Sequence, residues 1–218
     1  MQARQGVSLV IYDLDGVLID SSTAIVESFR RTMSEAGLSP QPEERIKGFI
    51  GYSLNDIFRI ILPEEQHHRV DEMKRLFRRH FSELCLQGTY LLDGVAETLQ
   101  VLQERGLIQC VATNKHSELA RKILEHLGVT DYFSMIVGAL DVPNPKPEPD
   151  MIKLILREHA VEPRGAVFVD DTALGLTAGK RAETKTVGIT TGYDDTSSLE
   201  SISPDHIIEC ISELVTLL

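Results

Sequence analysis

The stretch Val7-Ser8-Leu9-Val10-Ile11-Tyr12-Asp13-Leu14-Asp15-Gly16 decides the fold of this chain. Its first six residues are almost all apolar, a pattern typical of a buried strand in a parallel sheet. Asp13 and Asp15 follow directly, and ligands of open α/β sheets bind at the carboxyl ends of the strands. The two carboxylates would repel each other if they were bare, so they favour a divalent cation between them or a nucleophile beside a proton donor. Acids that cap a solvated loop are the alternative, since short motifs also match by chance.

The composition is that of an ordinary soluble globular protein. Of the 218 residues, 42% are hydrophobic and 25% are charged, and the length suffices for one good-sized domain or a core with a smaller insertion. The formal net charge of -11 argues against a nucleic-acid partner. It also means that an anionic substrate needs locally placed cations to be held.

The lack of a recognisable targeting signal and the pattern of cysteines lead us to expect a cytoplasmic protein. No basic segment followed by an apolar run precedes the first strand, and no apolar run approaches membrane-spanning length. We therefore expect neither secretion nor a membrane partner. Cys85, Cys110 and Cys210 are odd in number and no pair has metal-ligand spacing, which favours reduced thiols.

Helical patterns follow the first strand and extend to about residue 87. Ser21 or Ser22 can cap a helix that ends before Gly37, a short helix is expected at 54–62, and 64–84 shows apolar residues at helical spacing. The opposite face of 64–84 is either solvated or in contact with an anionic substrate or a partner. That face carries Lys74, Arg75, Arg78 and Arg79.

Helices and strands alternate from about residue 93. The pattern predicts helices at 93–105, 117–127, 149–159, 173–182 and 207–217, and strands at 107–112, 135–139, 166–169 and 186–190. Such alternation implies right-handed crossovers and an α/β fold, a Rossmann-like parallel sheet with helices on both faces. The all-helical stretch interrupts the alternation, so we expect an α/β catalytic core of residues 1–19 and 88–218 and an inserted all-helical cap domain of residues 20–87.

Three further polar segments accompany the predicted strands. Thr113-Asn114 and Asp170-Asp171-Thr172 each follow a strand, where hydroxyl, amide and backbone N–H groups can hold an anion. Lys146 lies among four prolines in residues 143–149, which leave it little conformational freedom and favour an ammonium held in a pocket. Each segment alone could be a helix cap or a loop, but together they predict one shared site.

Four motifs in this order resemble those of the haloacid dehalogenase-like phosphatases, and the resemblance covers essentially the whole chain. They are Asp13-Leu14-Asp15-Gly16-Val17-Leu18-Ile19-Asp20-Ser21, Thr113-Asn114-Lys115, Lys146-Pro147-Glu148-Pro149-Asp150 and Val169-Asp170-Asp171-Thr172. Within that superfamily the chain is most similar to phosphoglycolate phosphatases with a helical cap. Thr113-Asn114-Lys115 and, in the cap, Phe49-Ile50-Gly51-Tyr52-Ser53-Leu54 resemble that subgroup.

The resemblance implies hydrolysis of a small phosphorylated metabolite. Asp13 would attack phosphorus and become an aspartyl-phosphate, and Asp15 would protonate the leaving oxygen and then take a proton from water. Thr113 and Asn114 would hydrogen-bond the phosphoryl oxygens, and Lys146 would neutralise their charge. This set also satisfies elementary chemistry, because phosphoryl transfer requires mainly positioning and charge stabilisation.

The resemblance also implies a Mg²⁺ cofactor, bound by oxygen ligands that suit a hard cation. The implied ligands are Asp13, the backbone carbonyl of Asp15, Asp171 and, directly or through water, Asp170. Gly51 and Tyr52 would contact the substrate from the cap. We expect a monomer or a weak dimer.

The sequence departs from the phosphoglycolate phosphatase pattern at three positions. That pattern usually has glycine before its metal-binding aspartate and a second aspartate four residues later, but here Asp170 and Gly175 stand there. Glu183 replaces the glycine expected after the helix at 173–182, so we expect that helix to end without a left-handed residue.

Three rival functions are consistent with parts of the pattern. An acid pair followed by glycine resembles the β-phosphoglucomutase-like phosphotransferases, although Thr23, Ala24, Ile25 and Val26 stand where that branch usually has histidine and arginine, which favours hydrolysis. Inorganic pyrophosphate hydrolysis would use the same core chemistry. A non-catalytic binding module would lack Asp13 or Lys146, and both are present.

Overall fold

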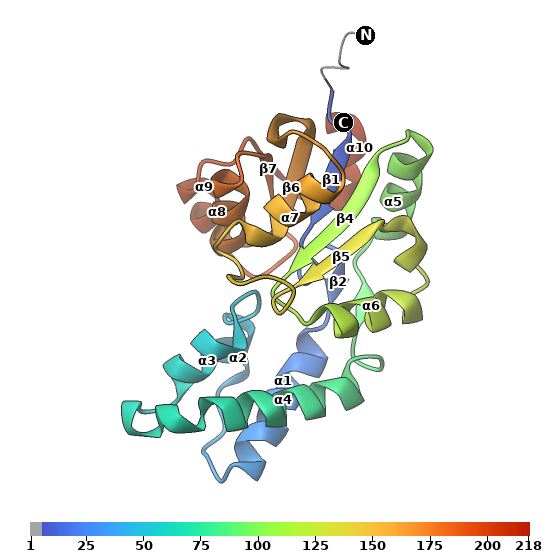
Figure 1. Cartoon of the computed structure of the whole chain (residues 1–218). Helices are drawn as coiled ribbons and strands as arrows, with labels where there is room; N and C mark the ends of the chain where they lie inside the picture. Colours follow the sequence, from blue (N-terminus) through green and yellow to red (C-terminus); the bar gives the residue numbers. More distant parts are fainter. Residues whose placement is uncertain (1–5) are drawn as a thin grey trace.

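Six parallel strands form the central sheet of the computed structural model, which describes residues 6–218 (Figure 1). The strands lie in the order β5-β4-β1-β6-β7-β8, with β1 between β4 and β6. Their bounds are β1 Leu9–Tyr12, β4 Ile108–Thr113, β5 Met135–Gly138, β6 Ala166–Asp170, β7 Lys185–Ile189 and β8 His206–Ile208. The carboxyl ends of β1, β4 and β6 therefore meet at one edge.

Helices cover both faces of this sheet because side chains alternate along β1. Leu9 and Ile11 pack in the cluster that contains residues of α7 (Asp150–Glu158) and α8 (Ala173–Arg181). Val10 and Tyr12 point the other way, toward α5 (Val95–Glu104), α6 (Ser117–His126) and α10 (Leu214–Leu217). All four side chains are fully buried, and each burial stabilises the fold by about 1.5–3 kcal/mol. The predicted α/β fold with a helix-covered parallel sheet is confirmed.

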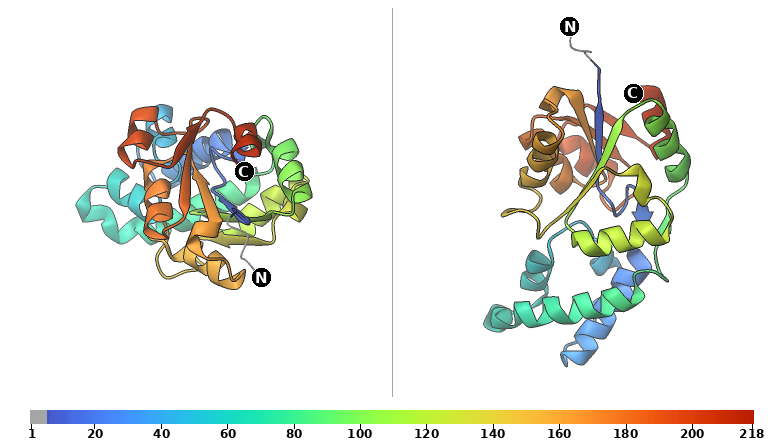
Figure 2. Two further views of the ribbon diagram at one scale, coloured as in Figure 1. Left: turned by 90° about the horizontal axis from the view of Figure 1, so that it is seen from above. Right: turned by 45° about the vertical axis from the view of Figure 1, so that its right-hand side comes forward.

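Four helices lie beyond the carboxyl edge of the sheet, in the lower part of Figure 1 and of the right panel of Figure 2. They are α1 Ser22–Glu35, α2 Glu43–Lys47, α3 Leu54–Ile61 and α4 Val70–Leu84, preceded by a 3-10 turn at Glu64–Arg69. The ring centroid of Phe29 is 5.4 Å from that of Phe58 and 4.5 Å from that of Phe77, which joins α1, α3 and α4. A short antiparallel pair, β2 (Ile19–Asp20) and β3 (Tyr90–Leu91), connects these helices to the rest. The division at residues 20 and 87 stays a prediction.

The helix predicted at 207–217 is wrong. Ile207 and Ile208 belong to β8, which pairs with β7 at the edge of the sheet, and only a 3-10 turn at Ile211–Glu213 and α10 follow. A run of three strand residues next to apolar helical residues has no distinct period, so the pattern could not separate the two. The helix α9 (Thr196–Ser201) between β7 and β8 was also absent from the prediction.

The expected end of the helix before Glu183 is also wrong. Glu183 adopts a left-handed conformation with φ of 62° although it is not glycine. The N–H of Thr184 donates to the carbonyl of Gly179 at 3.2 Å, and that of Glu183 to Lys180 at 3.0 Å. These two bonds make the usual left-handed helix end, and they offset the strain of about 1–2 kcal/mol in Glu183.

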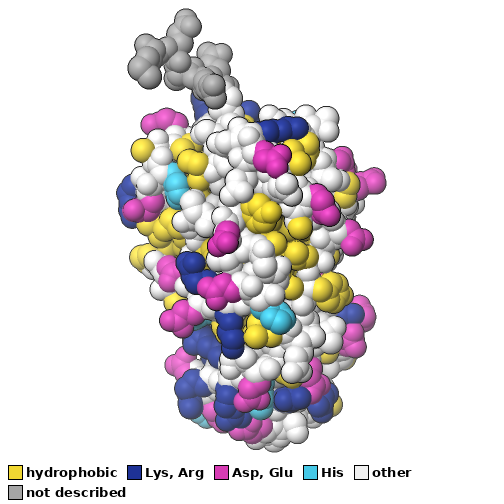
Figure 3. Space-filling model, turned by 90° about the vertical axis from the view of Figure 1, so that its right-hand side faces the viewer, with side chains coloured by type: hydrophobic (Ala, Val, Ile, Leu, Met, Phe, Trp, Pro, Cys, Tyr) yellow, Lys and Arg dark blue, Asp and Glu magenta, His cyan; other side chains and the backbone are white. Residues whose placement is uncertain are grey.

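Positive and negative side chains are interspersed over the face drawn in Figure 3. Many of them are paired within one helix, as Arg30 and Glu27 are at 2.6 Å in α1. Such exposed pairs contribute little to stability. Within residues 6–218, no helix has the length and apolar character that crossing a membrane requires.

Candidate active site at the carboxyl edge of the sheet

The ends of three neighbouring strands bring together the predicted catalytic groups. Asp13 follows β1, Thr113 is the last residue of β4 and Asp170 is the last residue of β6. The backbone N–H of Asp13 continues the ladder to β6 by donating to the carbonyl of Val169 at 2.9 Å. Since β1 lies between β4 and β6, the three side chains share one buried space, and each is at most 2% exposed.

Lys146 lies between two of these carboxylates. Its Nζ is 2.9 Å from Asp13 Oδ1 and 2.8 Å from Asp170 Oδ2, and the residue is only 3% exposed. The amide of Asn114 fixes the loop that carries it, because Asn114 Oδ1 accepts from the Lys146 N–H at 3.1 Å and Asn114 Nδ2 donates to the Lys146 carbonyl at 3.3 Å. The lysine is therefore held between the two carboxylates.

Asp170 fills the space that a side chain at position 175 would need. A Cβ atom on Gly175 would lie 1.8 Å from Asp170 Oδ2. The other oxygen of Asp170 accepts from the N–H of Thr172 at 2.9 Å and from its hydroxyl at 2.7 Å. Aspartate at 170 and glycine at 175, which the sequence shows as two separate departures, are thus one compensated exchange in space.

Two glycines form a cradle for Asp171. A Cβ atom on Gly16 would lie 2.2 Å from Asp171 Oδ2, and one on Gly192 would lie 1.8 Å from the same oxygen. Gly16 also needs its left-handed φ of 77° to turn the chain after Asp15. Oδ2 of Asp171 accepts from the N–H of Tyr193 at 2.9 Å. The sequence reasoning missed Gly192, although it closely follows β7 and so marks a further strand end.

Asp15 is held by two groups. The hydroxyl of Ser21 donates to Asp15 Oδ1, and Lys115 Nζ lies 3.0 Å from Asp15 Oδ2. Lys115 is also 4.4 Å from the centroid of the Phe81 ring in α4. The sequence reasoning named Lys115 as part of a motif but gave it no role. Its ammonium joins the strand-end site to the helices beyond it.

Burial and excess negative charge dominate the electrostatics. Two ammonium groups face four buried carboxylates, which leaves two negative charges in excess when all are ionised: Lys115 and Lys146 against Asp13, Asp15, Asp170 and Asp171. Burial raises the pKa of Asp13 to about 7, although Lys146 opposes the shift. Burial and the neighbouring Asp170 hold the pKa of Asp171 well above its usual range. Burial lowers the pKa of Lys146, but Asp13 and Asp170 outweigh it and raise that pKa.

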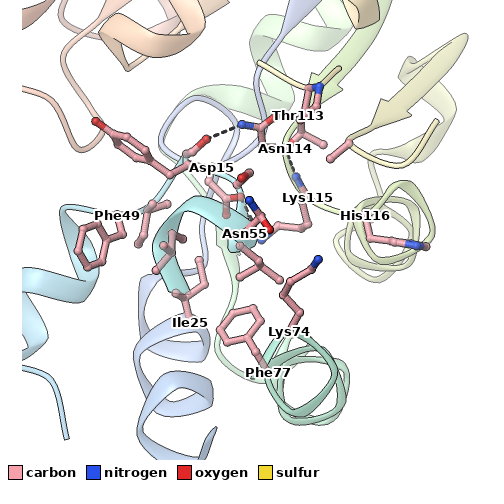
Figure 4. A pocket seen from close by; sticks show the side chains of 18 of the residues that line it. Asp15, Ile25, Phe49, Asn55, Lys74, Phe77, Thr113, Asn114, Lys115 and His116 are labelled. Carbon is pink, nitrogen blue, oxygen red and sulfur yellow. Dashed lines mark hydrogen bonds and ion pairs between the residues drawn. The ribbon is translucent and has the colours of Figure 1, made fainter. Parts of the chain in front are cut away.

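A cavity of about 350 Å³ is lined by Asp13 and Asp15 and by residues of the helices beyond the sheet. Figure 4 shows Asp15 at this cavity, together with side chains from those helices. Gly51 and Tyr52 line it from the loop before α3, and Tyr52 is 39% exposed. The carbonyl of Gly51 accepts from Asn114 Nδ2 at 2.8 Å, so Asn114 ties this loop to the strand end. The cavity lining includes six predicted site residues: Asp13, Asp15, Gly51, Tyr52, Thr113 and Asn114. Lys146 contacts Asp13, and Asp170 and Asp171 each have a carboxylate oxygen within 4.8 Å of one of Asp13. What each residue does there stays a prediction.

Three of the carboxylates could hold a divalent cation. Asp13, Asp170 and Asp171 each offer one oxygen, and these atoms lie within 4.8 Å of one another. Within residues 6–218, the buried Asp171 Oδ1 has no hydrogen-bond partner. An ion with two positive charges would balance the two negative charges in excess, and an all-oxygen set suits Mg²⁺. The residues present therefore fit such an ion.

Comparisons with known proteins agree with this geometry. A family model described as haloacid dehalogenase-like hydrolase matches residues 10–189. The phosphoglycolate phosphatase of Escherichia coli (strain K12) is 30% identical over 232 residues, which cover 96% of this chain and 91% of that protein. The phosphoglycolate phosphatase of Salmonella paratyphi A is 29% identical and covers 100% of this chain and 95% of its own.

Solved structures show the same fold. A haloacid dehalogenase-like family hydrolase from Streptococcus pneumoniae superposes with a TM-score of 0.88 at 24% identity, over 97% of this chain and 98% of its own. A predicted phosphoglycolate phosphatase from Haemophilus somnus gives a TM-score of 0.86 at 24% identity, over 98% of each chain.

Proposed function

The chain belongs to the haloacid dehalogenase-like hydrolase family, and we propose that it hydrolyses a small phosphomonoester with Mg²⁺, through an aspartyl-phosphate on Asp13. The observation that carries the proposal is the buried position of Lys146, whose ammonium lies 2.9 Å from Asp13 and 2.8 Å from Asp170. A buried carboxylate is better able to receive a phosphoryl group when a fixed cation beside it neutralises the negative charge of that group. The similar phosphoglycolate phosphatases make phosphoglycolate the first substrate to test.

The residues divide the reaction between them. An oxygen of Asp13 forms a bond to phosphorus while the bond from phosphorus to the ester oxygen breaks, and Asp15 gives a proton to that oxygen. Asp15 then takes a proton from water, whose oxygen bonds to phosphorus and releases Asp13. Ser21 and Lys115 orient Asp15 for both transfers.

The other polar groups stabilise charge. Thr113 and Lys146 face the phosphoryl oxygens, and Asn114 positions Lys146 through its backbone. Asp13, Asp171, the backbone carbonyl of Asp15 and Asp170 would hold Mg²⁺, with Asp170 reached through water because both its oxygens already accept hydrogen bonds. When bound, the ion supplies positive charge that favours the ionised form of Asp13 and the transferring phosphoryl group.

The helical segment would act as a cap over this site. Gly51 and Tyr52 would contact the leaving group, since the cavity extends from Asp13 to their loop. A compartment with reduced thiols, the cytoplasm, fits the three free cysteines Cys85, Cys110 and Cys210.

A phosphate-release screen tests the proposal. The purified protein is assayed with Mg²⁺ and with EDTA on phosphoglycolate, hexose phosphates, nucleotides and pyrophosphate, with Asp13→Asn as the matched inactive control. We expect Mg²⁺-dependent phosphate release from a small monoester by the unmodified protein alone. Transfer of the phosphoryl group to a sugar without phosphate release, or release from pyrophosphate alone, would overturn the proposal in favour of a phosphotransferase or a pyrophosphatase.

A further inference from the structure

Three polar side chains meet at the amino end of the sheet, away from the strand-end site. Cys110 is the third residue of β4, Ser134 directly precedes β5 and His159 directly follows α7. The packing of α7 against β4 and β5 brings them together. Cys110 precedes Thr113 by three residues in β4, a separation of about 10 Å along the strand. The proposed phosphatase reaction uses none of the three side chains.

The sulfur, nitrogen and oxygen atoms of this cluster converge on one another. Cys110 Sγ is 3.2 Å from Ser134 Oγ and 3.8 Å from His159 Nε2, and that nitrogen is 2.8 Å from Ser134 Oγ. With these three separations, a single point lies about 2 Å from all three atoms. Bonds from Zn²⁺ are about 2.0–2.1 Å to a histidine nitrogen and about 2.3 Å to a cysteine sulfur. One ion at this point would therefore reach all three atoms.

The ring of His159 is oriented as that of a metal-bound histidine is. Its Nδ1 lies 2.9 Å from the carbonyl oxygen of Ile155, and because a carbonyl only accepts, Nδ1 carries the proton. The neutral ring therefore directs the lone pair of Nε2 toward Ser134 and Cys110. A histidine that binds a metal almost always donates its other N–H to a carbonyl or a carboxylate in this way.

Burial argues against a role for Cys110 as a reactive thiol. The residue is fully buried and packs in the cluster that contains Ile155 and Leu156 of α7. Burial raises the pKa of its thiol to about 11, so little free thiolate is present for nucleophilic attack or oxidation. A metal ion can still bind there, because it displaces the proton of the thiol as it binds.

The kinds of donor atom distinguish this cluster from the carboxylates at the other end of the sheet. Thiolate and imidazole are ligands of Zn²⁺, whereas Mg²⁺ prefers oxygen ligands. Ser134 is exposed and His159 is half-buried, so an ion can enter from solvent on that side. A water molecule can then complete the four ligands that Zn²⁺ usually has.

We propose that Cys110, His159 and Ser134 form a Zn²⁺-binding site, separate from the carboxylate site and independent of the proposed phosphatase function. On binding, the S–H bond of Cys110 breaks, its sulfur bonds to the ion and the proton passes to solvent. Nε2 of His159 and the hydroxyl oxygen of Ser134 each donate a lone pair, and nothing is oxidised or reduced. The ion joins β4, the start of β5 and the end of α7, and it stabilises the folded protein because only the folded chain brings these ligands together.

The test uses Co²⁺ as a spectroscopic substitute for Zn²⁺. Thiolate bound to Co²⁺ gives a charge-transfer absorption in the near ultraviolet, which an all-oxygen site cannot give. Co²⁺ is titrated into the protein, which is kept reduced with a phosphine, in excess Mg²⁺ that competes for the carboxylates. The variants are Cys110→Ser, His159→Gln and Ser134→Ala, each checked for folding by its thermal melting curve. The matched control is the double variant Cys85→Ser/Cys210→Ser, in which Cys110 is the only thiol.

We expect one Co²⁺ per chain with this absorption in the unmodified protein and in the double variant, and its loss when Zn²⁺ displaces the Co²⁺. Cys110→Ser should abolish the absorption. His159→Gln should weaken Co²⁺ binding at least tenfold, since the loss of even a residue that supports a ligand costs about 10- to 100-fold in affinity. Ser134→Ala should weaken binding less, because water can replace a neutral oxygen.

Cys210 is the competing thiol. It is exposed, and its Sγ lies 3.1 Å from Ser212 Oγ and 3.6 Å from Glu213 Oε1. An absorption that Cys110→Ser keeps and the double variant loses would overturn the proposal.

Two further results would also overturn it. One is the absence of the absorption from the unmodified protein at millimolar Co²⁺, which does not depend on the folding of any variant. The other is unchanged Co²⁺ affinity in a folded His159→Gln variant. Phosphate release is measured separately, so neither result bears on the proposed phosphatase function.

Discussion

Exchanging Asp170 and Gly175 in one protein should restore the partner of Lys146 that Asp170→Gly removes, and should relieve the overlap that Gly175→Asp creates. In Asp170→Gly, Lys146 loses Asp170 and keeps Asp13 as an ion-pair partner. In Gly175→Asp, the new side chain enters the volume of the Asp170 carboxylate, since a Cβ atom there would lie 1.8 Å from Oδ2. In the double variant, the vacated volume receives the new carboxylate, next to the Lys146 ammonium.

The magnitudes follow from the bonds that break. Asp170→Gly removes the bond to Lys146 and two to Thr172, partly offset by weaker repulsion from Asp13 and Asp171, and we expect a loss of about 3 kcal/mol in the free energy of unfolding. Gly175→Asp adds overpacking and another buried carboxylate, which also costs about 3 kcal/mol. Independent effects would sum to about 6 kcal/mol. We expect the double variant to lose only about 3 kcal/mol.

Urea unfolding in EDTA measures this coupling, and kcat/KM with Mg²⁺ is measured alongside. The double variant should be more active than Asp170→Gly because Lys146 regains its position. A double variant whose loss equals the sum of the single losses would show that the two positions do not compete for one space.

Three further outcomes follow from the same geometry. Asp171→Asn should weaken Mg²⁺ binding far more than Asp170→Asn, because Asp171 Oδ1 has no partner within residues 6–218 whereas both oxygens of Asp170 are hydrogen-bonded. Activity measured across a Mg²⁺ titration tests this. If excess Mg²⁺ fully rescues Asp171→Asn while Asp170→Asn stays inactive, the two ligand roles are reversed. Burial raises the pKa of Asp13 to about 7, above its ordinary value of about 4. Protonated Asp13 therefore stabilises the metal-free fold fully below about pH 4, and this stability is lost as the pH rises to about 7. In EDTA, the melting temperature of the unmodified protein should therefore fall relative to that of Asp13→Asn as the pH rises over that range. A difference between the two melting temperatures that does not change with pH would contradict the raised pKa. Gly51→Ala should strain the loop, because φ of Gly51 is 97°, and the new Cβ atom would lie 3.2 Å from the Thr172 side chain. The variant should reduce turnover of the preferred substrate more than turnover of p-nitrophenyl phosphate. Equal losses for the two substrates would argue against contact between this loop and the leaving group.

Local pattern was enough to predict the strand ends that form the site. The apolar run before Asp13 and the polar residues after β4 and β6 have distinct periods and ends, and the parallel arrangement brings them to one edge. The same patterns predicted most of the helices on both faces, but not α9 or the short α10. The candidate site could therefore be predicted because, at these strand ends, the local sequence preferences agree with the tertiary fold.

Contacts between distant residues could not be predicted in this way. The cradle of Asp171 joins Gly16 to Gly192, and the site of Asp170 depends on the absence of a side chain at Gly175. Such fits depend on atomic positions that no periodicity encodes. The left-handed Glu183 is a related case, since two backbone hydrogen bonds outweigh its local preference.

The most direct test of the central assignment is a crystal structure with Mg²⁺ and beryllofluoride, which mimics a phosphoryl group bound to a carboxylate. We expect beryllium at bonding distance from an oxygen of Asp13, with Lys146 and Thr113 contacting the fluorides. Beryllofluoride attached to another side chain, with Asp13 beyond bonding distance, would show that Asp13 is not the nucleophile.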